Sequence, residues 1–113
     1  MFGDGTSSRD YTFVGDIVTG ILNSMNFIAE SMPLHSHEIF NLGNSKPVLL
    51  THLIKLIEET VGREAIINNA PDQLGDVTIT FAEISKARRL IDFDPKTDLS
   101  KGLEVTWQSM KIN

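Results

Sequence analysis

An α/β fold is predicted for this 113-residue chain, with a small sheet of short strands interleaved with about four helices. Short runs rich in β-branched and aromatic residues alternate with longer runs whose apolar residues recur every three or four positions. No internal repeat or low-complexity tract interrupts this alternation. The length fits one domain, so residues 1–113 are expected to form a single unit that hides roughly two-thirds of the unfolded chain's surface.

The first elements are a loop, a strand and a helix. Glycine and small polar residues predict the loop over residues 1–8. A short strand is expected over residues 11–14, and Asp16 is expected to cap the helix that follows. Helical spacing of the apolar residues predicts one buried stripe on that helix. They are Ile17, Val18, Ile21, Leu22, Met25 and Ile28. The helix is expected to fade near residues 29–32, before Pro33.

The middle of the chain is predicted to hold a connector, a strand and a second helix. The connector covers residues 33–37, the strand covers residues 38–42, and a turn rich in glycine, asparagine and proline follows. Thr51 suits the N-cap of the helix, and Gly62 stands where helices commonly end in the left-handed conformation. The apolar residues of this helix are Leu53, Ile54, Ile57 and Val61.

The remaining third is predicted to contain two extended segments and two helices. Residues 65–68 and 77–81 read as strands, separated by a loop. A short amphipathic helix follows, with Ile84, Ala87, Leu90 and Ile91 as its apolar residues. Asp98 is expected to cap the last helix. That helix has Leu99, Leu103, Trp107 and Met110 at helical spacing.

Composition excludes several classes of function. Cysteine is absent, which rules out disulfides, iron–sulfur clusters and thiolate zinc sites. The formal charge of −5 argues against broad nucleic-acid binding, which needs a basic stripe. No apolar run approaches the roughly 18 residues of a membrane span, and the N-terminal residues lack the layout of a signal peptide. We therefore expect a soluble, cytoplasmic protein with no nucleic-acid or membrane partner.

The segment over residues 2–16 is the strongest candidate for a ligand site. It sets one arginine, several hydroxyls and an aromatic ring beside glycines that let the backbone bend. A guanidinium can donate two parallel hydrogen bonds to phosphate oxygens, so Arg9 is a candidate for a phosphate-bearing ligand. A structural salt bridge with Asp10 or Asp16 is the competing interpretation, and from these residues alone the two are about equal.

Three motifs along nearly the whole chain resemble the C-terminal part of the NAD-dependent nucleotide-sugar epimerases, in the extended short-chain dehydrogenase/reductase family. They are GDGTSSRDYTFVGDIV, IFNLGNSKPVLLTHLIKLIEETVG and QLGDVTITFAEISKARRLIDFDPKTDLSKGLEVTW. The chain is most similar to the UDP-glucuronate and UDP-glucose 4-epimerase type. The resemblance implies a substrate domain that binds a UDP-sugar, a parent enzyme that uses NAD, and a Rossmann domain as partner.

Two hallmarks of that family are not found in this sequence. The glycine-rich G-x-x-G-x-x-G loop that holds the NAD pyrophosphate is absent. The catalytic pair, a tyrosine followed four residues later by a lysine, is absent too. Tyr11 is the only tyrosine, and Gly15 stands four residues after it. The chain is therefore expected to carry no catalytic or cofactor-binding residue and to be inactive alone, as one part of a larger enzyme.

The resemblance implies five substrate-binding residues: Arg9, Tyr11, Gln73, Asp76 and Thr80. It assigns Arg9, in an R-D-[YF] motif, to the diphosphate. Tyr11 faces either the ligand or the core, and Thr80 matches a position that can touch the nucleotide. Gln73 stands where the family commonly has arginine, so its phosphate contact should be weaker. Asp76 is expected to accept from a ribose hydroxyl or orient Arg9, or alternatively to be a turn residue.

Other features and functions remain open at this stage. His35 and His37 form an H-S-H pair, but no third ligand has clear spacing, so no metal site is expected. Asp10 and Asp16 are interpreted mainly as turn and cap residues. Two competing functions are a stand-alone binding module and a non-catalytic chain that self-associates through exposed apolar surface.

Overall fold

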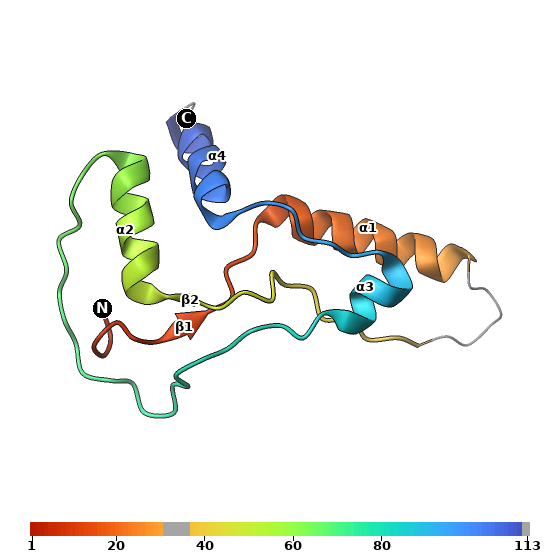
Figure 1. Ribbon diagram of the computed structural model, residues 1–113, viewed down its shortest axis with the longest axis horizontal. Helices are drawn as coiled ribbons and strands as arrows, with labels where there is room; N and C mark the ends of the chain where they lie inside the picture. Colours follow the sequence, from red (N-terminus) through yellow and green to blue (C-terminus); the bar gives the residue numbers. More distant parts are fainter. Residues whose placement is uncertain (31–36, 112–113) are drawn as a thin grey trace.

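The computed structural model describes residues 1–30 and 37–111, and it confirms a small α/β fold with four helices and a two-stranded sheet (Figure 1). In chain order the elements are β1 (Ser8–Arg9), α1 (Val14–Glu30), β2 (Val48–Leu49), α2 (Leu50–Val61), α3 (Ser85–Ile91) and α4 (Leu99–Lys111). None of these helices has both the length and the apolar character needed to cross a bilayer.

The sheet is a narrow strip centred on β1. Strand β1 pairs antiparallel with β2, where Ser8 lies opposite Leu49 and Arg9 opposite Val48. On its other edge Ser8 forms a parallel bridge with Ile79. The Ser8 N–H donates to the Thr78 carbonyl at 2.8 Å, and the Thr80 N–H donates to the Ser8 carbonyl at 3.1 Å. The strip therefore holds Arg9 between two segments from distant parts of the chain.

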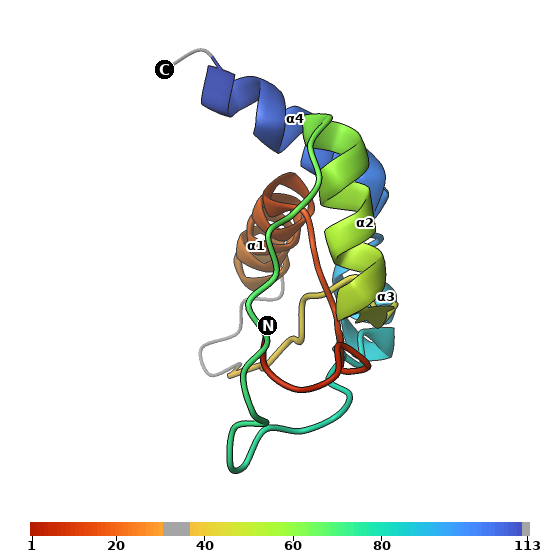
Figure 2. The ribbon, with the colours of Figure 1, turned by 90° about the vertical axis from the view of Figure 1, so that its left-hand side faces the viewer.

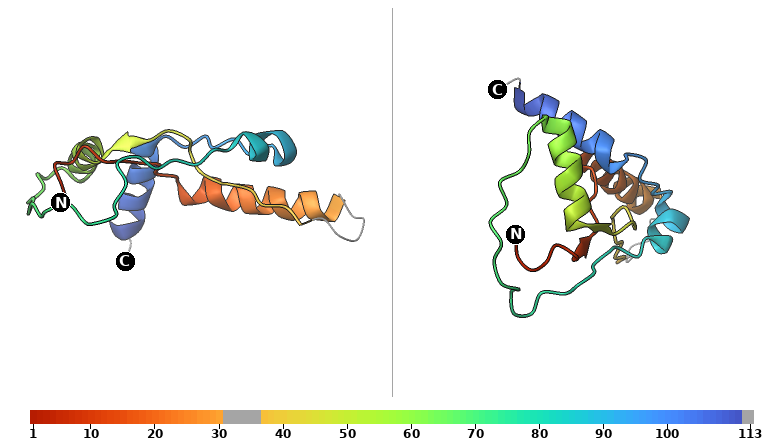
Figure 3. Two further views of the ribbon diagram at one scale, coloured as in Figure 1. Left: turned by 90° about the horizontal axis from the view of Figure 1, so that it is seen from below. Right: turned by 60° about the vertical axis from the view of Figure 1, so that its left-hand side comes forward.

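The helices form two separate pairs on either side of this strip. Helix α2 packs against α4, and α1 packs against α3 (Figures 1 and 2). The result is long and thin, with extents of 54 × 38 × 21 Å (Figure 3). Its radius of gyration is 17.4 Å, whereas a compact domain of this length has about 13 Å. This shape leaves much apolar surface uncovered.

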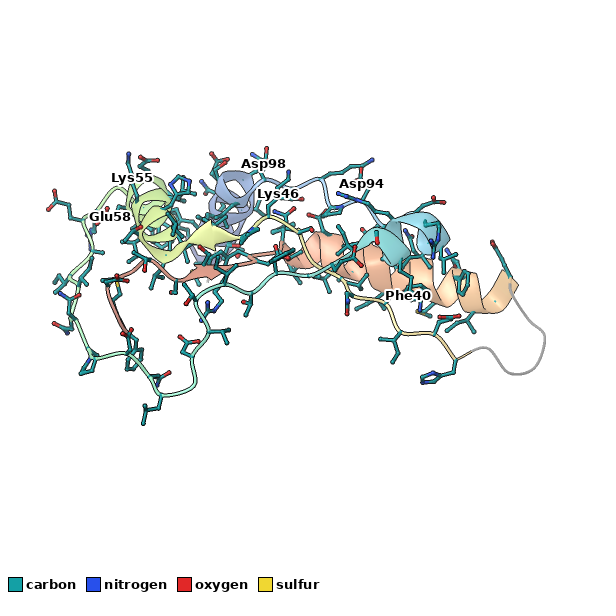
Figure 4. The ribbon with its side chains drawn as sticks, turned by 60° about the horizontal axis from the view of Figure 1, so that its bottom comes forward. Phe40, Lys46, Lys55, Glu58, Asp94 and Asp98 are labelled. Atoms are coloured by element: carbon teal, nitrogen blue, oxygen red, sulfur yellow. The ribbon has the colours of Figure 1, made fainter. Side chains whose placement is uncertain are left out.

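The buried core lies at the α1–α3 end. Its fully buried apolar residues are Ile84, Ala87, Ile91 and Phe93. Phe27 of α1 and Phe40 pack against this core. Their two rings meet edge to face, with 5.6 Å between the ring centroids. Figure 4 shows Phe40 beside α1, far from Lys55 and Glu58 on α2. The Lys86 ammonium lies 5.3 Å from the centre of the Phe40 ring and pairs with Glu38, which fastens residues 38–40 to α3.

The prediction that the apolar stripe of α1 is buried is wrong. The helix forms as expected, but six of its large apolar residues are between 48% and 67% exposed. They are Val14, Val18, Ile21, Leu22, Met25 and Ile28. Only Gly20 of this helix is buried. The periodic pattern correctly predicted an apolar face, but among the described residues nothing covers it.

The predicted strands fare less well than the helices. Residues 11–14, 38–42 and 65–68 form no strand, and within 77–81 only Ile79 forms a bridge. The two strands are instead Ser8–Arg9 and Val48–Leu49, neither of which was predicted from sequence. A strand needs a neighbour to satisfy its backbone, and these three segments have no strand neighbour within the described ranges. Composition alone could not reveal that.

The predicted helix caps are partly corrected. Asp16 lies in the first turn of α1 and does not cap it, since the helix begins at Val14. Helix α2 begins at Leu50, with Leu49 as its N-cap residue, so the Thr51 cap was wrong. Gly62 is confirmed: it has φ of 75°, and its N–H donates to the Glu58 carbonyl at 2.8 Å. At α4, the carbonyl of Asp98 accepts from the Gly102 N–H at 2.9 Å.

Most of the predicted connector, residues 33–36, lies outside the described residues, and so does His35 of the H-S-H pair. His37 is exposed. Among the described residues no three histidine or acidic side chains come together as a metal site would require.

Candidate functional site

Arg9 is held at the end of β1 with its guanidinium turned towards residues 76–78. Its Nη1 donates to the Ser8 carbonyl at 2.9 Å and to the Thr78 carbonyl at 3.4 Å. Its Nη2 pairs with Asp76 Oδ1 at 2.5 Å. These bonds anchor the Arg9 side chain, which remains 28% exposed.

Asp76 closes a turn that also carries Gln73. The Asp76 N–H donates to the Gln73 carbonyl at 3.1 Å, and Gly75 between them has φ of 87°. A residue with a side chain is strained in that region, which explains the glycine. The Asp76 side chain is 48% exposed. The structure therefore joins two of the interpretations made from sequence: Asp76 is a turn residue, and it also orients Arg9.

Two cavities flank the Arg9–Asp76 pair. A polar cavity of about 300 Å³ is lined by Gln73 and Asp76, by Asp72, and by the backbone-rich loop Phe2 to Ser7. A second cavity of about 350 Å³ is lined by Arg9, Tyr11 and Thr80, together with Leu42 and Gly43. The five predicted site residues thus divide between two adjoining hollows, and the ion pair joins them.

The loop before β1 lines the polar cavity. It belongs to the segment over residues 2–16 that the sequence indicated as a ligand site, although none of its residues was among the five predicted site residues. Asp4 Oδ1 accepts from the Thr6 N–H at 2.9 Å and from the Thr6 hydroxyl at 2.6 Å. These bonds, the hydroxyl first, hold the pKa of the Asp4 carboxyl below its ordinary value. The D-x-T spacing, typical of a side-chain-closed turn, was the available signal. The ordered turn gives the cavity a fixed wall.

Tyr11 lies at a boundary between cavities. It is half-buried, and it lines both the hollow beside Arg9 and a larger apolar cleft of about 420 Å³ between α2 and α4. The apolar cleft is lined chiefly by Phe13, Leu53, Ile57 and Leu103. From sequence, Tyr11 is expected to face either the ligand or the core, and its position is compatible with both.

The ion pair proposed as an alternative for Arg9, with Asp10 or Asp16, is not the one formed. The Asp16 carboxylate accepts from the backbone N–H groups of Lys96 and Thr97, at 3.3 and 3.0 Å. The Asp10 carboxylate accepts from backbone N–H groups of residues 44–46 and of Ala82. Both aspartates therefore join chain segments, a role that sequence reasoning described only as turn and cap.

The sequence and the structure of the chain were compared with those of known proteins. No protein-family model matches the chain. A UDP-glucuronate 4-epimerase of Thermodesulfobacterium geofontis is 35% identical over 115 residues, covering 99% of this chain and 33% of the relative. The crystal structure of a Bacillus cereus UDP-glucuronic acid 4-epimerase with UDP-glucuronic acid and NAD matches with a TM-score of 0.84 and 30% identity, over 99% of this chain and 34% of that one.

A further solved structure agrees. The UDP-glucose 4-epimerase of Thermotoga maritima, solved with UDP-glucose, matches with a TM-score of 0.83 and 29% identity, again over 99% of this chain and 34% of that one. The chain thus spans about a third of the length of the proteins it matches.

These matches define a class, the NAD-dependent nucleotide-sugar epimerases of the extended short-chain dehydrogenase/reductase family. Within that class this chain is similar over nearly its whole length to UDP-glucuronate and UDP-glucose 4-epimerases, and the match is consistent with the C-terminal part of such a protein. The family predicted from the three sequence motifs is confirmed.

Proposed function

We propose that this chain binds the diphosphate of a UDP-sugar through Arg9, as the substrate-binding part of a nucleotide-sugar 4-epimerase. The observation that carries the proposal is the Arg9 side chain, which pairs with Asp76 and is still 28% exposed. Arginine has five N–H donors, and the bonds within the described residues use three of them. Two donors are left for phosphate oxygens.

The neighbouring residues complete the proposed site. Gln73 lies on the turn that carries Asp76 and would donate a neutral hydrogen bond to phosphate, weaker than arginine would give. Asp76 would keep one oxygen for Arg9 and use the other for a ribose hydroxyl. Tyr11 and Thr80 line the hollow beside Arg9 and would contact the nucleotide there. Such remote contacts supply binding energy that positions the sugar ring for reaction elsewhere.

Among residues 1–30 and 37–111, no segment fits an NAD site of the family's kind. Gly3 and Gly5 have positive φ, but they precede strand β1. A Rossmann glycine loop instead follows a strand and opens a helix, whose free N–H groups face the pyrophosphate. We therefore place NAD and the catalytic tyrosine and lysine in the two-thirds of the relatives' length that this chain does not span.

Titration with uridine and UDP tests the role of Arg9. Arg9→Ala should weaken UDP binding roughly ten- to a hundredfold, because a hydrogen bond to a charged group contributes about 1.5–3 kcal/mol. Binding of uridine, which has no phosphate, should stay unchanged. Arg89→Ala, at an exposed arginine on α3, is the matched control and should leave both affinities unchanged. Equal UDP affinity of Arg9→Ala and the parent would show that the assignment is wrong.

The exposed face of α1 supports a second component of the proposal, a protein partner. Contiguous apolar patches of this kind mark interaction surfaces in soluble proteins. We propose that this face packs against a Rossmann domain, located in the part of the relatives' length that this chain does not span.

The same face favours the alternative function, a non-catalytic module that self-associates. Sedimentation at increasing concentration separates the two. Concentration-dependent association abolished by Met25→Lys, with UDP binding absent, would support the alternative. A monomer that binds UDP would support the proposed function.

A further inference from the structure

A part-buried carboxylate next to Arg9 collects most of the hydrogen bonds that join three distant segments. Asp10 Oδ2 accepts from the Ser45 N–H at 2.9 Å and from the Ala82 N–H at 3.0 Å. Asp10 Oδ1 accepts from the Asn44 N–H at 3.2 Å and lies 3.5 Å from the Lys46 nitrogen. A carboxylate with several backbone N–H donors is a strong, directional anchor.

The chain around Asp10 is shaped to admit this carboxylate. Gly43 is buried, and a Cβ there would lie 2.8 Å from Asp10 Oδ2 and 2.4 Å from the Ala82 Cβ, closer than atoms can pack. Ser45 adopts φ of 56°, which turns its N–H inward. The Thr12 hydroxyl accepts a second bond from the Asn44 N–H at 3.0 Å. The turn over residues 43–46 is thus wrapped around the side chain.

The anchored segments are the ones that form the proposed ligand site. The turn over residues 43–46 leads directly into β2, which pairs with Arg9. Ala82 ends the stretch that carries Asp76, Thr78 and Thr80, the first two of which contact the Arg9 side chain. Asp10 therefore fastens both neighbours of β1 at one end, one residue from the guanidinium.

We propose that Asp10 is a positioning residue for UDP-sugar binding, which sets the place and direction of the Arg9 guanidinium without touching the ligand. This inference rests on the proposed function. It differs from a general structural role because it predicts a loss of phosphate affinity that other anchoring aspartates do not share. A misplacement of a functional group by about 1 Å can reduce the activity of a site about a hundredfold.

The test compares Asp10→Asn with Asp16→Asn. The amide keeps the shape of the carboxylate but replaces one acceptor oxygen with a donor that faces backbone N–H groups. Asp16 is the matched control, because its carboxylate also joins segments through two backbone N–H groups but does so beside residues 96–97. The UDP dissociation constant and the side-chain N–H nuclear magnetic resonance signals of Arg9 are measured for each variant.

Asp10→Asn should raise the UDP dissociation constant by about tenfold or more. It should also merge the separate N–H resonances of the Arg9 side chain, because the guanidinium would no longer be held in one orientation. Asp16→Asn should change neither. Unchanged affinity and unchanged Arg9 signals in Asp10→Asn, or equal losses in both variants, would overturn the inference.

The readouts also separate this inference from the proposed function. If the parent chain does not bind UDP, the proposed function fails, and the Arg9 signals alone decide the role of Asp10. If Asp10→Asn does not fold, Thr12→Val replaces it, since this variant removes only the second acceptor of the Asn44 N–H. About a threefold loss of UDP affinity is then expected, and an unchanged affinity would overturn the inference.

Discussion

Gly20→Ala is expected to destabilise the protein even though alanine is the better helix former. Gly20 is buried in the middle of α1. A Cβ there would lie 2.9 Å from Leu42 Cδ1, Leu42 Cδ2 and Phe93 Cδ2, whereas carbon atoms pack at about 3.5–4.0 Å. Helix propensity favours alanine by about 1 kcal/mol. Overpacking costs about 1–3 kcal/mol, and Phe93 is too deeply buried to move aside.

The expected balance is a loss of about 1 kcal/mol in the free energy of unfolding. Gly102→Ala is the control, because Gly102 is also a buried glycine in a helix. A Cβ there would lie 3.2 Å from Phe13 Cδ2 and no closer to any other atom, so a small shift suffices. This variant should be neutral or gain about 0.5 kcal/mol.

Urea denaturation measures both variants, followed by helical circular dichroism and by the fluorescence of Trp107, the only tryptophan. The circular dichroism midpoint should fall for Gly20→Ala and should not fall for Gly102→Ala. If Gly20→Ala were as stable as Gly102→Ala, the space around Gly20 would not be as tight as the structure describes, and the reasoning from packing would be refuted.

Two further predictions concern a charge pair and a helix end. The Lys86 ammonium, 2.6 Å from Glu38 Oε2, holds the pKa of the Glu38 carboxyl below its ordinary 4.5. The pair therefore contributes stability above about pH 4.5 that is lost as the pH falls below it. Carboxyl resonance titration should show Lys86→Met raising the pKa of Glu38, because Lys86 is the largest cause of its lowering; an unchanged pKa would contradict the assignment. Gly62→Ala should cost about 1 kcal/mol in urea denaturation, because φ is 75° there. Gly62→Asn should cost less, since asparagine tolerates that conformation; equal costs would argue against a backbone origin.

The helices could be predicted from sequence because their signals are local. The apolar spacing in α1 and α2 and the left-handed Gly62 each depend on residues within a few positions. Strands depend on a neighbour that the sequence does not identify. Residues 38–42 have strand composition but no strand partner within the described part of the chain, while Ser8–Arg9 has ordinary loop composition and two neighbours.

Residue types alone indicated the segment over residues 2–16 and Arg9 as a candidate site, and the resemblance to a family added Gln73, Asp76 and Thr80. That resemblance brought Arg9 and Asp76 together, although 67 residues separate them. The resemblance did not predict the hydrogen bonds of Asp10. Its carboxylate accepts from the backbone N–H groups of residues 44, 45 and 82, and the sequence near Asp10 carries no signal for such distant partners. Burial of the α1 stripe could not be judged either, since periodicity shows that a face is apolar and not what covers it.

The 67-residue separation between Arg9 and Asp76 has a kinetic consequence. Closing a loop of that length costs roughly 4 kcal/mol of chain entropy, which few contacts repay until both neighbours of β1 are in place. Helices form within about a microsecond from local contacts. A refolding chain should therefore recover its helical signal before it recovers affinity for nucleotide. The interval between the two would measure how long the proposed binding site takes to assemble in a chain that is already helical.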